Sequence, residues 1–450
     1  MEAPARPALR RHLRRLLGAL ALLLLSGGAA LAAAVWQLDA TPRELARWLV
    51  ASRAEQPAWL RGGAQRLALE LVSVDRGVQA AATDYPAYAA PTASASAADP
   101  KPLRVVRVDR SEALAPALAS ALPGDLILLA PGRYRFSGEA LAVRVPGTDA
   151  APIVVRAATL GEVWLDFALV EGFKVNAPHW RFENLEIHGA CRDDSDCEHA
   201  FHVVGAAVDT RIEHCRLVDF NAPVKINGES GDFPDAGRIE ASELSATRGR
   251  ATANPVSFID LVGANGWRIE GNLIADFVKL QGDRVSYGAY AKGAGQGNVF
   301  ARNLVICEQR LRGADGARVG LSLGGGGSGP AYCRDRACIV EQQAGRLEDN
   351  LIAQCSDAGI YLNRAAQSVV SGNRLLDTAG IDGRFPETAA DLRGNIVDGP
   401  IHTRNDALLH EQDDRASPRV ASLAGAHPLR AELCTSVPAF KGLASCAAAR

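Results

Sequence analysis

A short apolar motif recurs eight times between residues 180 and 397, and it constrains the fold more than any other feature of the chain. Equivalent positions are separated by 22 to 31 residues, apart from one interval of 47. Each copy joins strand-like apolar positions to a Gly/Asn bend, which is the pattern of one coil of a β-solenoid. The copies are WRFENLEI, TRIEHCRL, GRIEASEL, WRIEGNLI, NVFARNLV, GRLEDNLI, SVVSGNRL and ADLRGNIV.

One bend position is asparagine in the last five copies: Asn272, Asn303, Asn350, Asn373 and Asn395. Stacked asparagines can bond to one another through their side-chain amides. The copies lack both the L-x-x-L-x-L register of leucine-rich repeats and the periodicity of helical repeats. We therefore expect an all-β fold, a single-stranded parallel β-helix with these asparagines in one column. The usual hand of crossover connections makes it right-handed.

Composition limits the classes of partner. The chain has 450 residues, 48% of them hydrophobic, and 43 glycines, which suits one large core with many turns and excludes overall disorder. Its formal charge of -2 and pI near 6.5 give no global basic field, so general nucleic-acid binding is not expected. An anionic partner would have to meet a local basic patch. We expect a monomer.

The N-terminus carries an export signal. Five arginines precede an apolar run from Leu16 to Trp36. Such a run can span a bilayer with the arginines in the cytoplasm, although Ala30 to Ala34 also offer cleavage sites for a signal peptidase. The length of the run favours the uncleaved anchor over a cleaved signal. Either way, the rest of the chain is expected in the periplasm or outside the cell.

The remaining chain divides by composition. Thr41, Pro42 and Glu44 form a capping-box pattern that predicts a short helical stalk near the membrane, within residues 37–80. An Ala/Pro/Ser-rich linker follows at 81–102. The β-helix is expected over 103–406, with a tail at 407–450.

Nine cysteines fit an oxidising compartment. Their spacing suggests the disulfides Cys191–Cys197, Cys333–Cys338 and Cys434–Cys446, whereas the alternative of zinc would need a matching second half of the motif. The other three lie in apolar strand patterns and are expected to be buried thiols: Cys215, Cys307 and Cys355.

A helix pattern followed by PGDLILLAPGRY, then APIVVRA and the stacked N-x-[IL] copies, resembles the β-helix polysaccharide lyases of the chondroitinase B and alginate lyase type. The resemblance extends from about Leu103 to Asp406. It implies a right-handed β-helix and an acidic polysaccharide as substrate.

Strand alternation predicts a column of outward residues along the strand that precedes each motif. At about 4.8 Å per coil, seven coils would make a groove of roughly 29 Å. Several members are basic although the protein is slightly acidic, which favours an anionic ligand over an ordinary solvated face. The column contains His202, Lys225, Asn227, Asp260, Tyr290, Lys292, Arg318, Ser322, Tyr361, Asn363 and Arg384.

The resemblance assigns the catalytic pair. YAKGAGQGNVFARN and ARVGLSLGGGG are similar to the lyase motifs, which gives the roles to Lys292 and Arg318. β-Elimination from a uronate needs a base for the C5 proton, a proton for the leaving oxygen and positive charge for the enolate. Basic neighbours could lower the pKa of Lys292 enough for it to act as the base. Tyr290 would assist as proton donor or as a platform for the sugar.

The calcium-binding E-x-E pair common in those lyases is replaced here by Val285, Ser286 and Tyr287. Ca²⁺ ligands could come instead from Asn227, Glu229 and Asp260. Alternatively Lys225 or Arg384 neutralises the substrate carboxylate without a metal.

Other chemistries have weaker support. The GGGGSGP stretch lacks the G-K-[ST] of a phosphate loop and is expected to lie over the groove, and no G-x-S-x-G elbow occurs. We expect an exported polysaccharide lyase acting on a uronate-containing polymer. The alternatives are a non-catalytic β-helix that binds or exports a polysaccharide and, with less support, a glycoside hydrolase, which would need two suitably spaced carboxylates.

Overall fold

The computed structural model describes residues 18, 26–28, 41–51, 56–76, 84–85, 101–325, 328–417 and 428–447. Nearly all of the expected export segment at 1–36, and most of the linker at 81–102, lie outside these ranges. Among the described residues, no helix is both long and apolar enough to cross a membrane.

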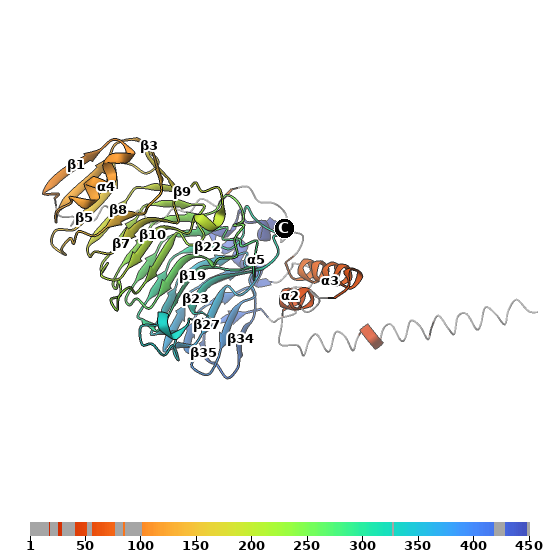
Figure 1. Cartoon of the computed structure of the whole chain (residues 1–450). Helices are drawn as coiled ribbons and strands as arrows, with labels where there is room; N and C mark the ends of the chain where they lie inside the picture. Colours follow the sequence, from red (N-terminus) through yellow and green to blue (C-terminus); the bar gives the residue numbers. More distant parts are fainter. Residues whose placement is uncertain are drawn as a thin grey trace, which may run out of the picture.

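Residues 104–416 wind into three long parallel sheets around one core (Figure 1). Each regular coil contributes one strand to each sheet, as β7, β8 and β9 do, followed by β10, β11 and β12. Neighbouring coils pair in parallel register, as Arg211 does with Arg181 and Arg238. This is the topology of a right-handed β-helix, as the repeat predicts.

The strand bounds follow the repeat closely. The twelve-stranded sheet contains β1 (Arg104–Val108), β2 (Asp125–Leu129), β5 (Ile153–Ala157), β8 (Trp180–Glu183), β11 (Arg211–Glu213), β14 (Arg238–Glu240), β17 (Arg268–Glu270), β21 (Val299–Ala301), β25 (Arg346–Glu348), β29 (Ser368–Ser371), β32 (Ala389–Arg393) and β35 (Leu408–Gln412). The eleven-stranded sheet contains β3 (Gly132–Ser137), β6 (Val163–Ala168), β9 (Glu186–Gly189), β12 (Arg216–Val218), β15 (Glu243–Ser245), β18 (Leu273–Ala275), β22 (Leu304–Ile306), β26 (Leu351–Ala353), β30 (Arg374–Leu376), β33 (Ile396–Val397) and β36 (Arg415–Ala416).

The ten-stranded sheet carries the residues predicted for the groove. It contains β4 (Leu141–Val143), β7 (Glu171–Val175), β10 (His199–Val204), β13 (Val224–Asn227), β16 (Val256–Val262), β19 (Val285–Lys292), β23 (Ala317–Gly324), β27 (Ile360–Asn363), β31 (Ile381–Arg384) and β34 (Ile401–Arg404). A small sheet of β20 (Gly295–Gln296), β24 (Gln342–Gln343) and β28 (Ala365–Ala366) joins it to the twelve-stranded sheet along the turns. Short 3-10 turns occur at η1 (Asp194–Asp196) and η2 (Pro330–Tyr332).

The asparagine column is confirmed. Each amide Nδ2 donates to the Oδ1 of the next asparagine at 3.0 Å, from Asn272 through Asn303, Asn350 and Asn373 to Asn395. The same oxygens accept backbone N–H groups, so the ladder satisfies buried polar groups at every bend. The residue before the ladder position is left-handed in all eight copies, with φ between 49° and 67°. Glycine takes that position in three copies because it adopts this conformation without strain.

The ends of the solenoid are covered. Helix α4 (Ser111–Ala119) buries Leu114 and Leu118 over the first coils. At the other end β35 and β36 pair with the preceding coils, so the β-helix extends beyond the expected limit at Asp406. Three short elements, α5 (Pro428–Ser436), η3 (Pro438–Phe440) and α6 (Ala444–Ala447), then pack their apolar residues against the eleven-stranded sheet.

Two N-terminal helices, α2 (Pro42–Ala51) and α3 (Ala58–Arg76), lie side by side on the flank of the solenoid (Figure 1). The capping box forms, because Thr41 N–H donates to Glu44 Oε2 at 2.7 Å and Glu44 N–H donates to Thr41 Oγ1 at 3.3 Å. Arg43 donates to the carbonyl of Cys355 at 2.7 Å, and Arg76 pairs with Glu308. These two helices lie within the helical region expected at 37–80, and buried charges join them to the coils.

The structure contains four disulfides in its described residues. Three join the expected pairs, Cys191–Cys197, Cys333–Cys338 and Cys434–Cys446. The fourth joins Cys307 and Cys355, so the expectation of two buried thiols there is wrong. These cysteines follow β22 and β26, which pair directly, and stacking brings their Cα atoms within 4.8 Å. Cys215 is a buried free thiol, as expected.

This pairing predicts a thiol count. Denatured, unreduced protein from an oxidising compartment should label at one cysteine, Cys215, because the other eight are joined. Mass spectrometry after alkylation measures the number directly, and the Cys215→Ser variant should take up no label. Labelling of Cys307 and Cys355 in the unreduced wild type would contradict the fourth disulfide.

Candidate functional site

The predicted groove residues form two neighbouring columns on the outer face of the ten-stranded sheet. In the first, register pairs His202 with Lys225, Lys225 with Asp260, Asp260 with Tyr290, Tyr290 with Ser322 and Ser322 with Tyr361. In the second, two residues further along each strand, Asn227 and Lys292 both pair with Val262, and Asn363 pairs with Arg384. Alternation therefore predicted which residues share the face.

A polar cluster surrounds Lys292 at the end of β19. Its Nζ lies 4.5 Å from the centre of the Tyr290 ring, close enough for a cation–π contact. On the coils before it, Lys225 Nζ lies 2.6 Å from Asp260 Oδ2, and Asp260 is only 5% exposed. Two ammonium groups, a carboxylate and a phenol thus occupy three successive coils.

Burial sets the protonation of this cluster. It lowers the pKa of Lys292, and Lys225 lowers it further, while the carboxylates of Asp260 and Glu341 oppose the shift. Burial also raises the pKa of Tyr290 well above its usual value, and the nearby Asp260 carboxylate adds to that effect. For Asp260, burial would raise the pKa, but Lys225 and Lys292 outweigh burial and lower it. The surroundings therefore shift Lys292 toward its neutral form and Tyr290 toward its protonated form.

The other column residues are held by internal partners. His202 Nδ1 lies 2.8 Å from Glu171 Oε1, and its Nε2 lies 2.8 Å from Asn227 Oδ1. Ser322 Oγ donates to the Gly324 carbonyl at 2.6 Å, so this hydroxyl is buried rather than open to a ligand. Further along, Asn363 Nδ2 donates to the Tyr361 hydroxyl at 2.8 Å, and Arg384 Nε donates to Asn405 Oδ1 at 3.3 Å.

The three residues expected as calcium ligands each contact another side chain in this structure. Asp260 forms an ion pair with Lys225, and Glu229 Oε1 lies 3.1 Å from Lys174 Nζ. The side-chain oxygen Oδ1 of Asn227 lies 2.8 Å from His202 Nε2. Each expected ligand therefore already has a partner, whereas calcium takes six to eight oxygen ligands. A different group of donor atoms, from Asp149, His179 and Asp209, comes within 4.8 Å on a turn of an earlier coil, but Arg211 Nε also lies 3.0 Å from Asp209.

The expectation that Arg318 lies beside Lys292 is wrong. Register places Arg318 opposite Ser286, whereas Tyr290 lies opposite Ser322. Arg318 comes four residues before Ser322 and therefore lies about 13 Å from Ser322 along the strand. Its guanidinium is 1% exposed and lies 2.8 Å from Glu308. Burial lowers the pKa of Arg318 against the opposing effect of Glu308. The loop that holds Glu308, together with helices α2 and α3, covers this end of the strand, so Arg318 belongs to a buried ion network.

Sequence reasoning expected a loop with the Cys333–Cys338 disulfide here but missed the roles of Glu341 and Arg334. Glu341 Oε2 accepts the backbone N–H of Gly293 at 2.9 Å and so fixes the bend directly after Lys292. Arg334, inside the Cys333–Cys338 loop, binds both oxygens of Asp235 at 2.7 and 2.8 Å. The only sequence signal was the interval of 47 residues, which contains both side chains. The disulfide-closed loop lies next to Lys292, because the Arg334 N–H donates to the carbonyl of Gly293 at 2.9 Å.

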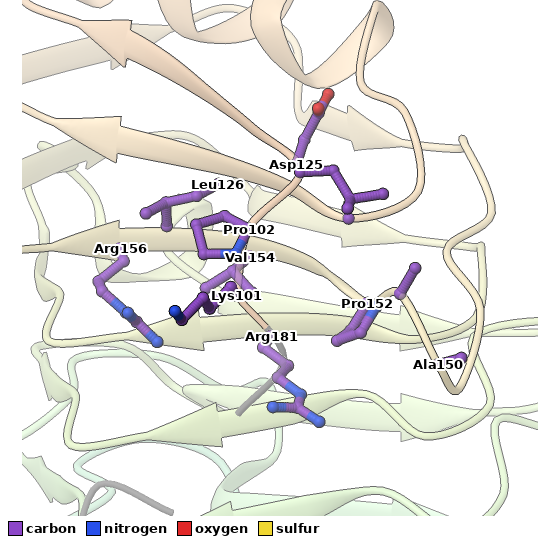
Figure 2. A pocket seen from close by; sticks show the side chains of 12 residues that line it. Lys101, Pro102, Asp125, Leu126, Ala150, Pro152, Val154, Arg156 and Arg181 are labelled. Carbon is purple, nitrogen blue, oxygen red and sulfur yellow. The ribbon is translucent and has the colours of Figure 1, made fainter. Parts of the chain in front are cut away.

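A separate surface cavity of about 290 Å³ lies at the first coils, on the twelve-stranded sheet (Figure 2). Arg156 and Arg181 extend from β5 and β8, which pair directly, with Lys101 beside them. Because Arg156 lies 2.5 Å from Glu183, part of this positive charge is already neutralised. The cavity is on a different sheet from Lys292 and does not belong to the groove.

Comparison with known proteins gives short sequence matches and a long structural one. No protein-family model matches the chain. It is 34% identical over 84 residues to pectate lyase L of Dickeya dadantii strain 3937, and 33% identical over 84 residues to pectate lyase L of Dickeya chrysanthemi. Each match covers 16% of this chain and 20% of the relative, so the chain spans about a fifth of these curated relatives.

Among solved structures, pectate lyase Pel9A matches with a TM-score of 0.50 at 15% identity, covering 74% of this chain and 85% of that one. The fold is that of the right-handed β-helix polysaccharide lyases. A mannuronic acid-specific family 6 polysaccharide lyase from human gut microbiota also matches, with a TM-score of 0.43, 14% identity and coverage of 70% and 82%. The β-helix fold predicted from the repeat is confirmed.

Proposed function

We propose that this chain is an exported polysaccharide lyase that cleaves a uronate-containing acidic polysaccharide by β-elimination. The observation that carries the proposal is the partly buried Lys292, whose pKa is lowered by burial and by Lys225, and whose Nζ lies 4.5 Å from the Tyr290 ring centre on the ten-stranded sheet. The likeness to pectate lyases supports the same reaction class. Four disulfides support an oxidising compartment, and membrane anchoring by residues 1–36 stays a prediction.

The reaction assigns a role to each member of the cluster. Neutral Lys292 removes the C5 proton of the uronate, and the electron pair of that C–H bond forms the C4–C5 double bond as the C4–O bond breaks. Tyr290 stays protonated at neutral pH because its pKa is raised, and it donates its proton to the departing oxygen. Lys225 supplies positive charge toward the substrate carboxylate. The Lys292 ammonium then returns a proton to Tyr290 through water, which restores both groups.

Hydrolysis has less support. Asp260 and Asp382 share a column, but register places Tyr290, Ser322 and Tyr361 between them. Four coils correspond to about 19 Å, which exceeds the carboxylate separations of about 5 to 9.5 Å used by glycosidases. Asp260 is also neutralised by Lys225.

The direct test is incubation of the full chain with a panel of acidic polysaccharides, beginning with pectate and including alginate and chondroitin sulfate. The ultraviolet absorbance of unsaturated uronates should rise with at least one polymer. Mass spectrometry should show products that lack the mass of the water molecule that hydrolysis would add. Saturated products would indicate hydrolysis. Polymer binding without any cleavage would indicate the non-catalytic alternative.

Two substitutions should move the acid limb of the kcat/KM profile in opposite directions. Activity should rise with pH as Lys292 loses its proton, because only the neutral amine is a base. Lys225→Met removes a like charge that lowers the pKa of Lys292, so the limb should move to higher pH. Asp260→Asn removes a charge that raises this pKa, so the limb should move to lower pH. Shifts of the same sign would contradict Lys292 as the titrating base.

A further inference from the structure

Helices α2 and α3 expose an unusual amount of apolar surface. Trp48 is 59% exposed and Trp59 is 75% exposed, and the other exposed large apolar residues of these helices are Val50, Leu67, Leu69 and Val74. Trp59, Gly63 and Leu67 follow at intervals of four, and Val74 comes seven residues later, so they share one side of α3. Exposed apolar patches of this kind mark contact with another apolar phase or partner.

The opposite side of the hairpin is fixed to the solenoid by charge. Arg43 binds Asp75 and also lies 3.1 Å from Asp377 of the solenoid, while Arg76 binds Glu308. Arg43 and Arg76 are both at most 3% exposed. The hairpin therefore has one side bound to the coils by ion pairs and another that exposes large apolar residues of α3 around the exposed Glu70.

The sequence places the hairpin next to an apolar segment. The run from Leu16 to Trp36 ends six positions before Pro42, the first residue of α2. Six residues span at most about 22 Å when fully extended. If Leu16–Trp36 enters a bilayer, the helices must therefore lie at or close to its surface. Tryptophans are enriched at that depth, and amphipathic helices bind there through their apolar side.

We propose that the α2–α3 hairpin lies on the surface of a lipid bilayer, with Trp48, Trp59 and Leu67 in the interfacial region. This proposal does not depend on the lyase reaction. Because buried ion pairs join the hairpin to the coils, the bilayer would hold the β-helix in one orientation rather than on a free tether. The proposed partner is a lipid surface. A second copy of the chain or another protein covering the same residues is the alternative that the test distinguishes.

The test uses tryptophan fluorescence of the full chain in vesicles of phosphatidylethanolamine and phosphatidylglycerol. A portion of the lipid carries a quencher either near the headgroup or near the end of the acyl chain. The variant Trp48→Phe/Trp59→Phe is compared with wild type, and Trp164→Phe, which alters a tryptophan of β6, is the matched control. Trp36 is the third tryptophan of the N-terminal region, so the double variant should lose about two thirds of the quenched emission. Trp164→Phe should lose none of it.

Equal quenching of the double variant and wild type would overturn the proposal, because Trp48 and Trp59 would then lie away from lipid. Stronger quenching of these two tryptophans by the deep label than by the shallow one would also overturn it, since the hairpin would be inserted rather than superficial. A concentration-dependent dimer that removes the difference between variants would identify a second copy as the occupant. Equal melting temperatures of all three proteins would establish that the comparison concerns folded chains.

Discussion

Replacing Lys292 with alanine should lower kcat by about 10²- to 10⁴-fold, the usual contribution of a positioned general base. The expectation rests on three observations: Lys292 is on the outer face, its pKa is lowered by burial and Lys225, and its Nζ lies 4.5 Å from the Tyr290 ring centre. The melting temperature should change little, because the Lys292 side chain is only partly buried. Steady-state kinetics on the polymer that passes the absorbance screen measures the effect.

Two further variants separate base catalysis from charge. Lys292→Arg keeps a positive charge, but a guanidinium stays protonated at any working pH, so it should not restore turnover. Lys101→Ala removes an exposed lysine at the first coils and should leave kcat unchanged. If Lys292→Ala raises KM with kcat intact, or if arginine restores the rate, the lysine binds substrate by charge and is not the base.

The repeat made much of the fold predictable, because one period fixes which residues stack. The asparagine ladder and the two columns on the ten-stranded sheet follow from counting along equivalent strands. The three short-range disulfides also followed from spacing. Short spacing did not suggest the fourth disulfide, because Cys307 and Cys355 are 48 residues apart and meet only through the pairing of β22 with β26. A pairing of that kind is visible only once the coils are aligned in space.

Arg318 shows a second limit. Strand alternation correctly placed Arg318 on the same face of the sheet as Tyr290 and Lys292. Alternation does not predict which other segments cover each end of a strand. Glu308, which neutralises Arg318, comes from a loop, and Arg76 of α3 approaches the same carboxylate. That helix is more than 200 positions earlier in the sequence. Contacts between distant segments decide whether a basic residue meets substrate or a buried acid, and a single sequence does not reveal them.

Those contacts converge on Asp377, so Asp377→Asn should lower the free energy of unfolding by about 3–5 kcal/mol, the usual cost of removing one partner from a buried ion pair. Its carboxylate lies 3.1 Å from Arg43, 3.3 Å from Arg76 and 3.0 Å from Arg312, and it accepts a hydrogen bond from Ser445 at 2.8 Å. These partners come from both N-terminal helices, a solenoid loop and the C-terminal helices. Asparagine would remove the acid that pairs with Arg312 and one of the two acids that pair with each of Arg43 and Arg76.

Thermal or denaturant unfolding of the variant measures this loss, with Asp391→Asn as the control. Asp391 pairs with Arg393 at 2.8 Å on an exposed strand, where ion pairs contribute about 0–1 kcal/mol. If the two substitutions cost the same, the Asp377 network does not hold the termini. Trypsin cleavage after the exposed Arg61 and Arg66 of α3 should also be faster in Asp377→Asn, because the hairpin loses part of its attachment.

The pH dependence of this contribution has a definite sign. Burial alone would raise the pKa of Asp377, but Arg76, Arg312 and Arg43 outweigh it and hold the pKa well below its usual range. A carboxylate with a depressed pKa in the folded state stabilises the fold fully above its unfolded pKa of about 3.9, and that stability is lost only as pH falls below this value. The difference in unfolding free energy between wild type and Asp377→Asn should therefore be constant from neutral pH to about pH 5 and shrink in stronger acid. A difference that already fades between pH 7 and pH 6 would mean that another group, and not this carboxylate, binds the arginines of α2 and α3.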